Sequence, residues 1–121
     1  MGKNMKQNKP TDVLVRGTLD MMIMRTVATS AKHGYSIARE IGLQSGGVLT
    51  VEEGSLYPAL HRLEKKGLVS SHWERSENNR KAKFYLLTKD GAKQLIQKNQ
   101  AWKRVSDAVT AVMSGTTVSS V

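Results

Sequence analysis

Residues 53–69 read EGSLYPALHRLEKKGLV and carry the signals of one amphipathic helix. Its aliphatic residues recur at helical spacing and predict a single apolar stripe, formed by Leu56, Ala59, Leu60 and Leu63. We expect the Ser55 hydroxyl to cap the N-terminus and Pro58 to lie in the first turn, where a missing N–H has no intrahelical partner. Gly67 predicts the end of the helix, because glycine adopts the left-handed C-cap conformation without steric cost.

The face of this helix opposite the stripe is polar and carries Tyr57, His61, Arg62 and Lys65. A helix of about three turns fits the major groove of DNA, and these side-chain types can bind base edges and phosphates. The alternative is an ordinary solvated surface. This face therefore indicates a candidate recognition helix.

The composition restricts the class of protein. The 121 residues suffice for one domain, and the formal net charge of +9, spread along the chain, favours a polyanionic partner. The absence of cysteine excludes disulfides, thiolate metal sites and a cysteine nucleophile. No apolar run of about 20 residues and no signal peptide is evident, and the three histidines lack metal-ligand spacing. We expect a cytoplasmic protein without membrane span, cofactor or enzymatic activity.

The segments before the central stretch read as an arm and two helices. Residues 1–13 are polar, basic and interrupted by proline, which predicts a flexible arm. Apolar spacing predicts a first helix over 14–30 and a second over 35–43, separated by His33 and Gly34. The β-branched residues of 48–51 indicate a short edge strand or an extended link.

After Gly67, the pattern changes to two strands. We expect strands over 68–75 and 82–88, joined by a turn at 76–79. The basic residues at or just after the turn are Arg80, Lys81 and Lys83. Three helices followed by a hairpin predict a mainly α fold with a small β-hairpin, a winged helix-turn-helix domain over 14–88. The alternative for the hairpin is an ordinary solvated turn.

The last predicted element is a long helix over 89–114, capped by Thr88 and followed by a polar tail over 115–121. Its apolar residues recur at mixed three- and four-residue spacing and form a stripe along the helix. This stripe is too long to be covered by the domain's own core. We expect it to be a dimerisation helix; the alternative is folding back on its own domain. The candidate dimer-interface residues are Leu95, Ile96, Asn99, Trp102, Val105 and Val109.

Four segments resemble the PadR family of bacterial transcriptional regulators: HGYSI at 33–37, GSLYPALHRLE at 54–64, KGLV at 66–69 and YLLTKDG at 85–91. The likeness covers roughly residues 14–113, and the SLYPALHRLE block is its most specific part. The segments EEGSLYPALHRLE and SENNRKAK are also similar to a PadR subgroup common in Acidobacteria. The C-terminal part of this chain, a single predicted helix, resembles that of the short-tailed branch of the family.

The resemblance implies a homodimeric winged-helix repressor whose Tyr-Pro helix enters the major groove of double-stranded DNA. By position, Tyr57, His61 and Arg62 would face the groove, and Tyr35 and Ser36 would contact phosphates. The wing contacts would come from Arg80, Lys81 and Lys83. Ser55, Pro58 and Lys65 complete the candidate DNA-binding set.

Some members of that family bind planar drugs or phenolic acids between subunits through an aromatic residue of the last helix. Trp102 occupies a comparable place, which implies a small aromatic effector; the alternative is an interface or core anchor. The function that we expect is sequence-specific regulation by a homodimeric repressor that binds an inverted-repeat operator. The alternatives are a non-specific architectural or RNA-binding winged-helix protein, and a protein-interaction module.

Overall fold

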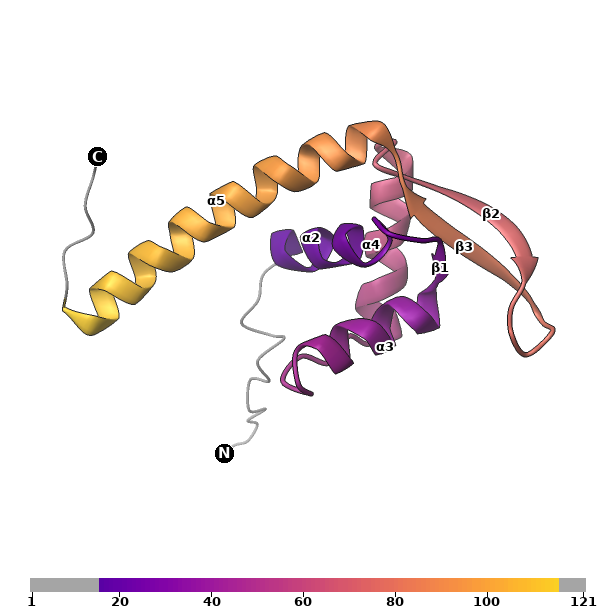
Figure 1. Cartoon of the computed structure of the whole chain (residues 1–121), viewed down its shortest axis with the longest axis horizontal. Helices are drawn as coiled ribbons and strands as arrows, with labels where there is room; N and C mark the ends of the chain where they lie inside the picture. Colours follow the sequence, from indigo (N-terminus) through magenta and orange to yellow (C-terminus); the bar gives the residue numbers. More distant parts are fainter. Residues whose placement is uncertain (1–15, 116–121) are drawn as a thin grey trace, which may run out of the picture.

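The computed structural model describes residues 16–115, so the predicted arm and most of the tail lie outside it. Helices α2, α3 and α4 form a cluster, from which the hairpin β2–β3 extends to one side and α5 to the other (Figure 1). The predicted mainly α winged helix-turn-helix arrangement is confirmed. The elements in chain order are α2 (Arg16–Thr26), β1 (Lys32–His33), α3 (Gly34–Gln44), α4 (Glu53–Lys65), β2 (Val69–Arg75), β3 (Lys81–Leu87) and α5 (Lys89–Ser114).

The core lies where α2, α3 and α4 meet, and it is aliphatic. Ile23 and Met24 of α2, Ile37 of α3 and Leu60 of α4 are all fully buried. The whole predicted stripe of α4 belongs to this cluster, which confirms the apolar face of the central stretch. Burial of each large aliphatic side chain stabilises the fold by about 1.5–3 kcal/mol, which fixes the rotation of α4 about its axis.

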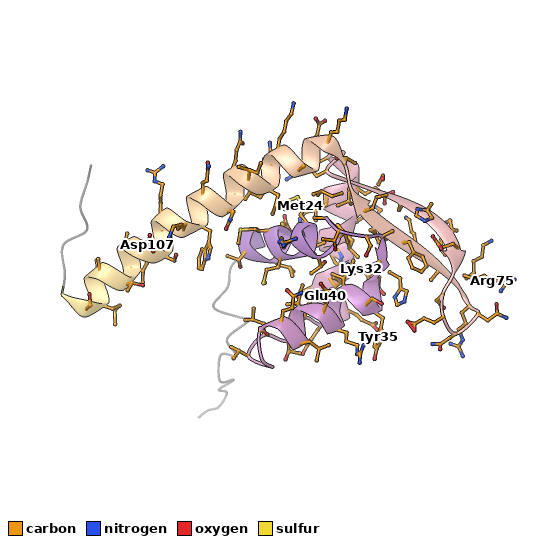
Figure 2. The ribbon with its side chains drawn as sticks, viewed as in Figure 1. Met24, Lys32, Tyr35, Glu40, Arg75 and Asp107 are labelled. Carbon is orange, nitrogen blue, oxygen red and sulfur yellow. The ribbon has the colours of Figure 1, made fainter. Side chains whose placement is uncertain are left out.

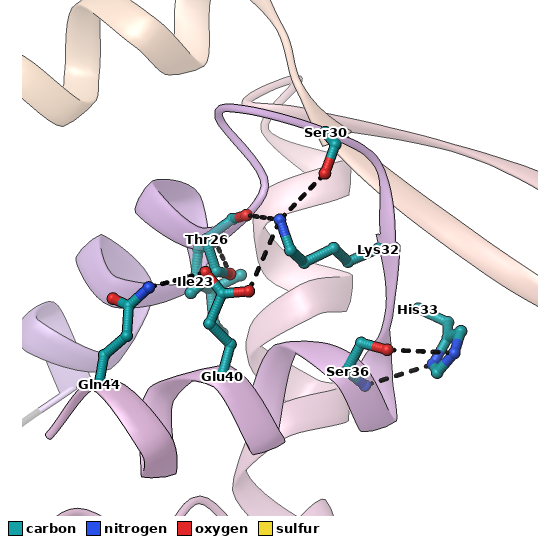
Figure 3. Close-up of polar contacts among 8 residues, drawn as sticks. All are labelled: Ile23, Thr26, Ser30, Lys32, His33, Ser36, Glu40 and Gln44. Atoms are coloured by element: carbon teal, nitrogen blue, oxygen red, sulfur yellow. Dashed lines mark hydrogen bonds and ion pairs between the residues drawn. The ribbon is translucent and has the colours of Figure 1, made fainter. Parts of the chain in front are cut away.

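Helix α2 ends at Thr26, four residues earlier than the sequence predicts. The Lys32 ammonium donates to the Thr26 carbonyl at 2.6 Å and lies 3.8 Å from Glu40 of α3 (Figure 3). The side chain of Lys32 therefore satisfies a carbonyl that the next helical turn would otherwise use. The same lysine joins the end of α2 to α3.

The sheet has three strands rather than the predicted two. The strand β1 pairs with β3 in the antiparallel order β1-β3-β2, with His33 opposite Phe84. A strand of two residues is too short to show a period in the sequence. The segment 48–51 forms no strand, so of the two alternatives left open by the sequence it is a link, between α3 and α4.

The start of α4 corrects the prediction made from Ser55. The helix begins at Glu53 with Glu52 as its N-cap, and no side chain makes a cap hydrogen bond there. Ser55 lies in the first turn, where its N–H donates to the Glu52 carbonyl at 3.0 Å. Pro58 consequently lies inside the helix rather than in its first turn. The helix starts earlier because Val51 and Leu56 both pack on the core, and Glu53 lies favourably at its positive end.

The predicted end of α4 is confirmed. Gly67 has a φ of +76°, and its N–H donates to the Glu64 carbonyl, while that of Leu68 donates to Leu63. This pair of bonds satisfies two carbonyls of the last turn and directs the chain into β2. At the far end of the hairpin, Asn79 adopts a φ of +59°, a conformation that asparagine tolerates in turns.

Helix α5 is held at its first turn to the end of α4. The Thr88 hydroxyl accepts from the Gly91 N–H at 3.0 Å, as predicted, and donates to the Gly67 carbonyl at 2.7 Å. A Cβ on Gly91 would lie 2.0 Å from the carbonyl oxygen of Leu68. Only glycine fits at this contact.

We therefore expect Gly91→Ala to lower the free energy of unfolding by about 3 kcal/mol, because a backbone group must move to admit the methyl group. The matched control is Gly17→Ala in α2, where an added Cβ has no neighbour within 4 Å. Urea denaturation followed by circular dichroism measures both. Equal stability of Gly91→Ala and wild type would contradict the close contact.

Candidate nucleic-acid interface

The exposed face of α4 is a row of polar side chains one turn apart. Tyr57, His61 and Lys65 follow one another at intervals of four residues, and all three are exposed. The buried stripe on the other side holds the helix in this rotation. The row therefore faces solvent as a continuous strip of hydrogen-bond donors and acceptors. Ser55, in the first turn of the helix, and Pro58, farther along it, are exposed as well.

The ring of Tyr57 lies directly over Gly34, the first residue of α3. A Cβ on Gly34 would lie 2.7 Å from the Tyr57 hydroxyl oxygen and less than 3 Å from two of its ring carbons. The tyrosine remains 45% exposed. The glycine in HGYSI therefore makes room for the tyrosine in SLYPAL, which joins the two helices of the helix-turn-helix.

The N-terminus of α3 is capped by a histidine. The Ser36 N–H donates to Nδ1 of His33 at 3.3 Å, and the Ser36 hydroxyl lies 3.2 Å from Nε2 of the same ring (Figure 3). Tyr35 is strongly exposed beside this cap, and its ring stacks with that of His33. Tyr35 and Ser36 thus lie together at the positive end of a helix, a favourable place for a phosphate.

Arg62 is the one predicted groove residue that binds inside the domain. Its Nη2 donates to Oδ1 of Asp20 at 3.0 Å, and the aspartate side chain is only 10% exposed. This pair directs the guanidinium toward α2, away from the row of Tyr57 and His61. Sequence reasoning overlooked Asp20, although a single acid inside the apolar run LDMMIM was a signal for a buried partner.

Glu64 joins α4 to both strands of the hairpin. Its carboxylate accepts from the Ser71 hydroxyl of β2 and from the Lys83 ammonium of β3, the latter at 3.3 Å. Lys83 also lies over the ring of Tyr85, 5.7 Å from its centre. The hydrogen bond from Ser71, together with Lys83, holds the pKa of Glu64 below its usual value despite partial burial. The ammonium of Lys83 is therefore paired with a carboxylate within the domain, and sequence reasoning did not foresee this partner.

The tip of the hairpin carries the cations that remain exposed on the wing. Arg80 and Lys81 are exposed, and Arg75 donates to the Asn79 carbonyl at 3.0 Å. Arg75 extends from the end of the hairpin farthest from the helices (Figure 2). This tip is the most basic part of the described hairpin.

A second exposed surface runs along α5. Leu95 packs partly against the domain core, whereas the predicted interface residues beyond it lie open to solvent. The exposed members are Ile96, Asn99, Trp102, Val105 and Val109, followed by Val112 and Met113. The distal half of α5, around Asp107, extends past the helix cluster (Figure 2). Trp102, Val105 and Val109 share one side of α5, whereas Ile96, nine residues or about two and a half turns before Val105, lies on the opposite side. A lone chain thus exposes an apolar face on the distal half of this helix.

Within residues 16–115, no helix is long and apolar enough to cross a bilayer. The same residues contain no group of three or more acidic, histidine or cysteine side chains that could hold a metal ion.

The sequence pattern of the transcriptional regulator PadR-like family matches residues 23–97. The transcriptional regulator Rv3488 of Mycobacterium tuberculosis is 29% identical over 84% of this chain and 91% of its own. A PadR-like regulator from Bacillus cereus is 30% identical, with a TM-score of 0.68 over 80% of this chain and 92% of that one. A PadR family regulator from Eggerthella lenta is 27% identical, with a TM-score of 0.71 over 84% and 86%.

Because the carboxylate of Glu64 is ionised when it binds Ser71 and Lys83, we expect the free energy of unfolding to depend on pH. Because its folded pKa is depressed, the carboxylate stabilises the fold fully above its ordinary value of 4.5 and loses this effect as the pH falls through the lower, folded value. We expect Glu64→Gln to melt below wild type at pH 7, with the difference disappearing on acidification. Thermal melts across pH measure this, with Glu77→Gln at the exposed turn as control. A constant difference at all pH values would contradict the role of the charge.

Proposed function

Because the chain belongs to the PadR-like family of transcriptional regulators, we propose that it is a homodimeric repressor that binds an inverted-repeat operator in double-stranded DNA. The observation that carries this proposal is the exposed row of Tyr57, His61 and Lys65 on a helix whose opposite face is buried. The net charge of +9 and the basic hairpin tip support a polyanionic partner. Such a regulator acts in the cytoplasm, where its promoter lies.

In this proposal, α4 enters the major groove with Tyr57 and His61 toward the base edges. A good side-chain contact to a base discriminates by about 1–3 kcal/mol. Arg62 is assigned a different role from the one that its position suggests, because its guanidinium binds the nearly buried Asp20. It would fix the orientation of α4 rather than read a base.

In this proposal, contacts to DNA phosphates would lie on either side of the groove contacts made by α4. Tyr35 and Ser36 lie at the N-terminus of α3, and Arg80 and Lys81 lie at the wing tip. Contacts of this kind place the protein on the duplex and carry little base information. They also make the affinity fall steeply with salt, because each neutralised phosphate releases counterions.

The dimer would form through α5. Trp102 shares the exposed apolar face with Val105 and Val109, which favours an interface anchor over a ring that stacks on an effector. Association of two such helices would remove this face from water and give the complex a twofold axis. Two recognition helices related by that axis match two half-sites about one duplex turn apart.

We expect the double substitution Tyr57→Ala plus His61→Ala to abolish preferential binding to the operator while the fold persists. The measurement is fluorescence anisotropy with a duplex selected from a random pool and with its scrambled counterpart, over a salt series. The matched control is Gln97→Ala plus Gln100→Ala on the exposed polar side of α5. Wild-type discrimination in the Tyr57/His61 variant would refute the assignment. Equal wild-type affinity for both duplexes would favour the non-specific architectural alternative.

The dimer proposal is tested at Trp102. We expect Trp102→Asp to give monomers in light scattering and to weaken operator binding, because an unpaired carboxylate would be buried between the helices. Gln100→Asp adds the same charge to the exposed polar side of α5 and should leave the dimer intact. A dimeric Trp102→Asp variant would place the interface elsewhere.

A further inference from the structure

Trp73 is the largest side chain of the wing, and the proposed function assigns it no role. It lies in the middle of β2, directly opposite Lys83 of β3, and is 61% exposed. Isolated exposed apolar residues are common on protein surfaces, so exposure alone means little. The direction of the ring and the charges around it are what distinguish this tryptophan.

The pairing of the strands determines which way Trp73 points. Residues two apart on a strand share a face, so Trp73 lies on the same side of the hairpin as Ser71. Ser71 and the cross-strand partner Lys83 both bind Glu64 of α4. Trp73 is therefore on the side of the hairpin that is turned toward α4, but beyond the part that α4 covers.

The two faces of the hairpin differ in charge. On the side turned toward α4, the next cross-strand pair beyond Trp73 is Arg75 with Lys81, two cations. The other face carries Glu74, which binds His72. A polyanion is thus attracted to the side on which the indole lies, and that side adjoins the row of Tyr57 on α4.

We propose that Trp73 contacts the sugar–phosphate backbone of the duplex that α4 binds, with its ring against a deoxyribose and its indole N–H donating to a phosphate oxygen. The proposal rests on the DNA binding proposed above and adds a contact to it. Tryptophan combines a large apolar face with one donor, which suits a backbone of apolar sugars and anionic oxygens. Because the contact is to the backbone, it should strengthen binding regardless of sequence.

The first test is anisotropy with the selected duplex and its scrambled counterpart. We expect Trp73→Ala to weaken both complexes by about tenfold, as for one lost hydrogen bond with its ring contact, and Trp73→Phe to weaken them less. The matched control is His72→Ala, the adjacent residue on the other face of β2, which should change the affinity less than about twofold. The ring of Trp73 is exposed, so these variants should keep the fold, as circular dichroism will verify.

The second test measures the solvent accessibility of the Trp73 indole directly, by its fluorescence. The chain has two tryptophans, so the difference in emission between wild type and Trp73→Phe isolates the fluorescence of the Trp73 indole. We expect the selected duplex to reduce its quenching by acrylamide. Suppose that wild type binds the duplex, but that the duplex does not change the quenching of Trp73 and that Trp73→Ala binds with wild-type affinity. This result would overturn the inference and leave the proposed function standing. Failure of wild type to bind any duplex would overturn both. A loss confined to the selected duplex would overturn the backbone contact in favour of a base contact.

Discussion

The carbonyl of Leu68 is the point at which α4, the β2–β3 hairpin and the long helix α5 are fixed to one another. It follows the left-handed Gly67, accepts from the Thr88 N–H at 3.2 Å and lies against the bare Cα of Gly91. The Thr88 hydroxyl bonds the adjacent carbonyl of Gly67. A single backbone turn, at Gly67 and Leu68, thus contacts the end of α4, the end of the hairpin and the first turn of α5. The angles among these three elements depend on this junction.

Two ion pairs then position α4 within the domain, and both use a cation that the sequence suggested for DNA. Asp20 binds Arg62 on the α2 side, and Glu64 binds Lys83 on the hairpin side. The pairs flank the exposed row that begins at Tyr57. The charge that is free to attract a duplex is therefore smaller than the formal total, and on the hairpin it lies at the tip rather than near the helix.

The elements that follow from local patterns were predictable from the sequence. The apolar stripe of α4, its end at Gly67, the cap at Thr88 and the length of α5 each depend on a few neighbouring residues. The parts that were missed depend on tertiary contacts. The strand β1 exists only through its pairing with β3, and α4 begins before Ser55 at a turn whose preceding residue, Val51, packs on the core. The partners Asp20 and Arg62 are 42 residues apart, a distance over which no spacing rule operates.

The length of α5 has a mechanical consequence. At about 1.5 Å per residue, its 26 residues extend about 39 Å from a first turn that is hydrogen-bonded to the end of α4. In a dimer joined along the distal half, the crossing angle of the two long helices would set the separation of the two recognition helices. A tilt of about 5° acting over about 39 Å would displace the α4 helix attached to each long helix by about 3 Å, close to the rise of one base pair. The distance between the two α4 helices, set at the far ends of two long helices, would therefore decide which half-site spacings the dimer accepts.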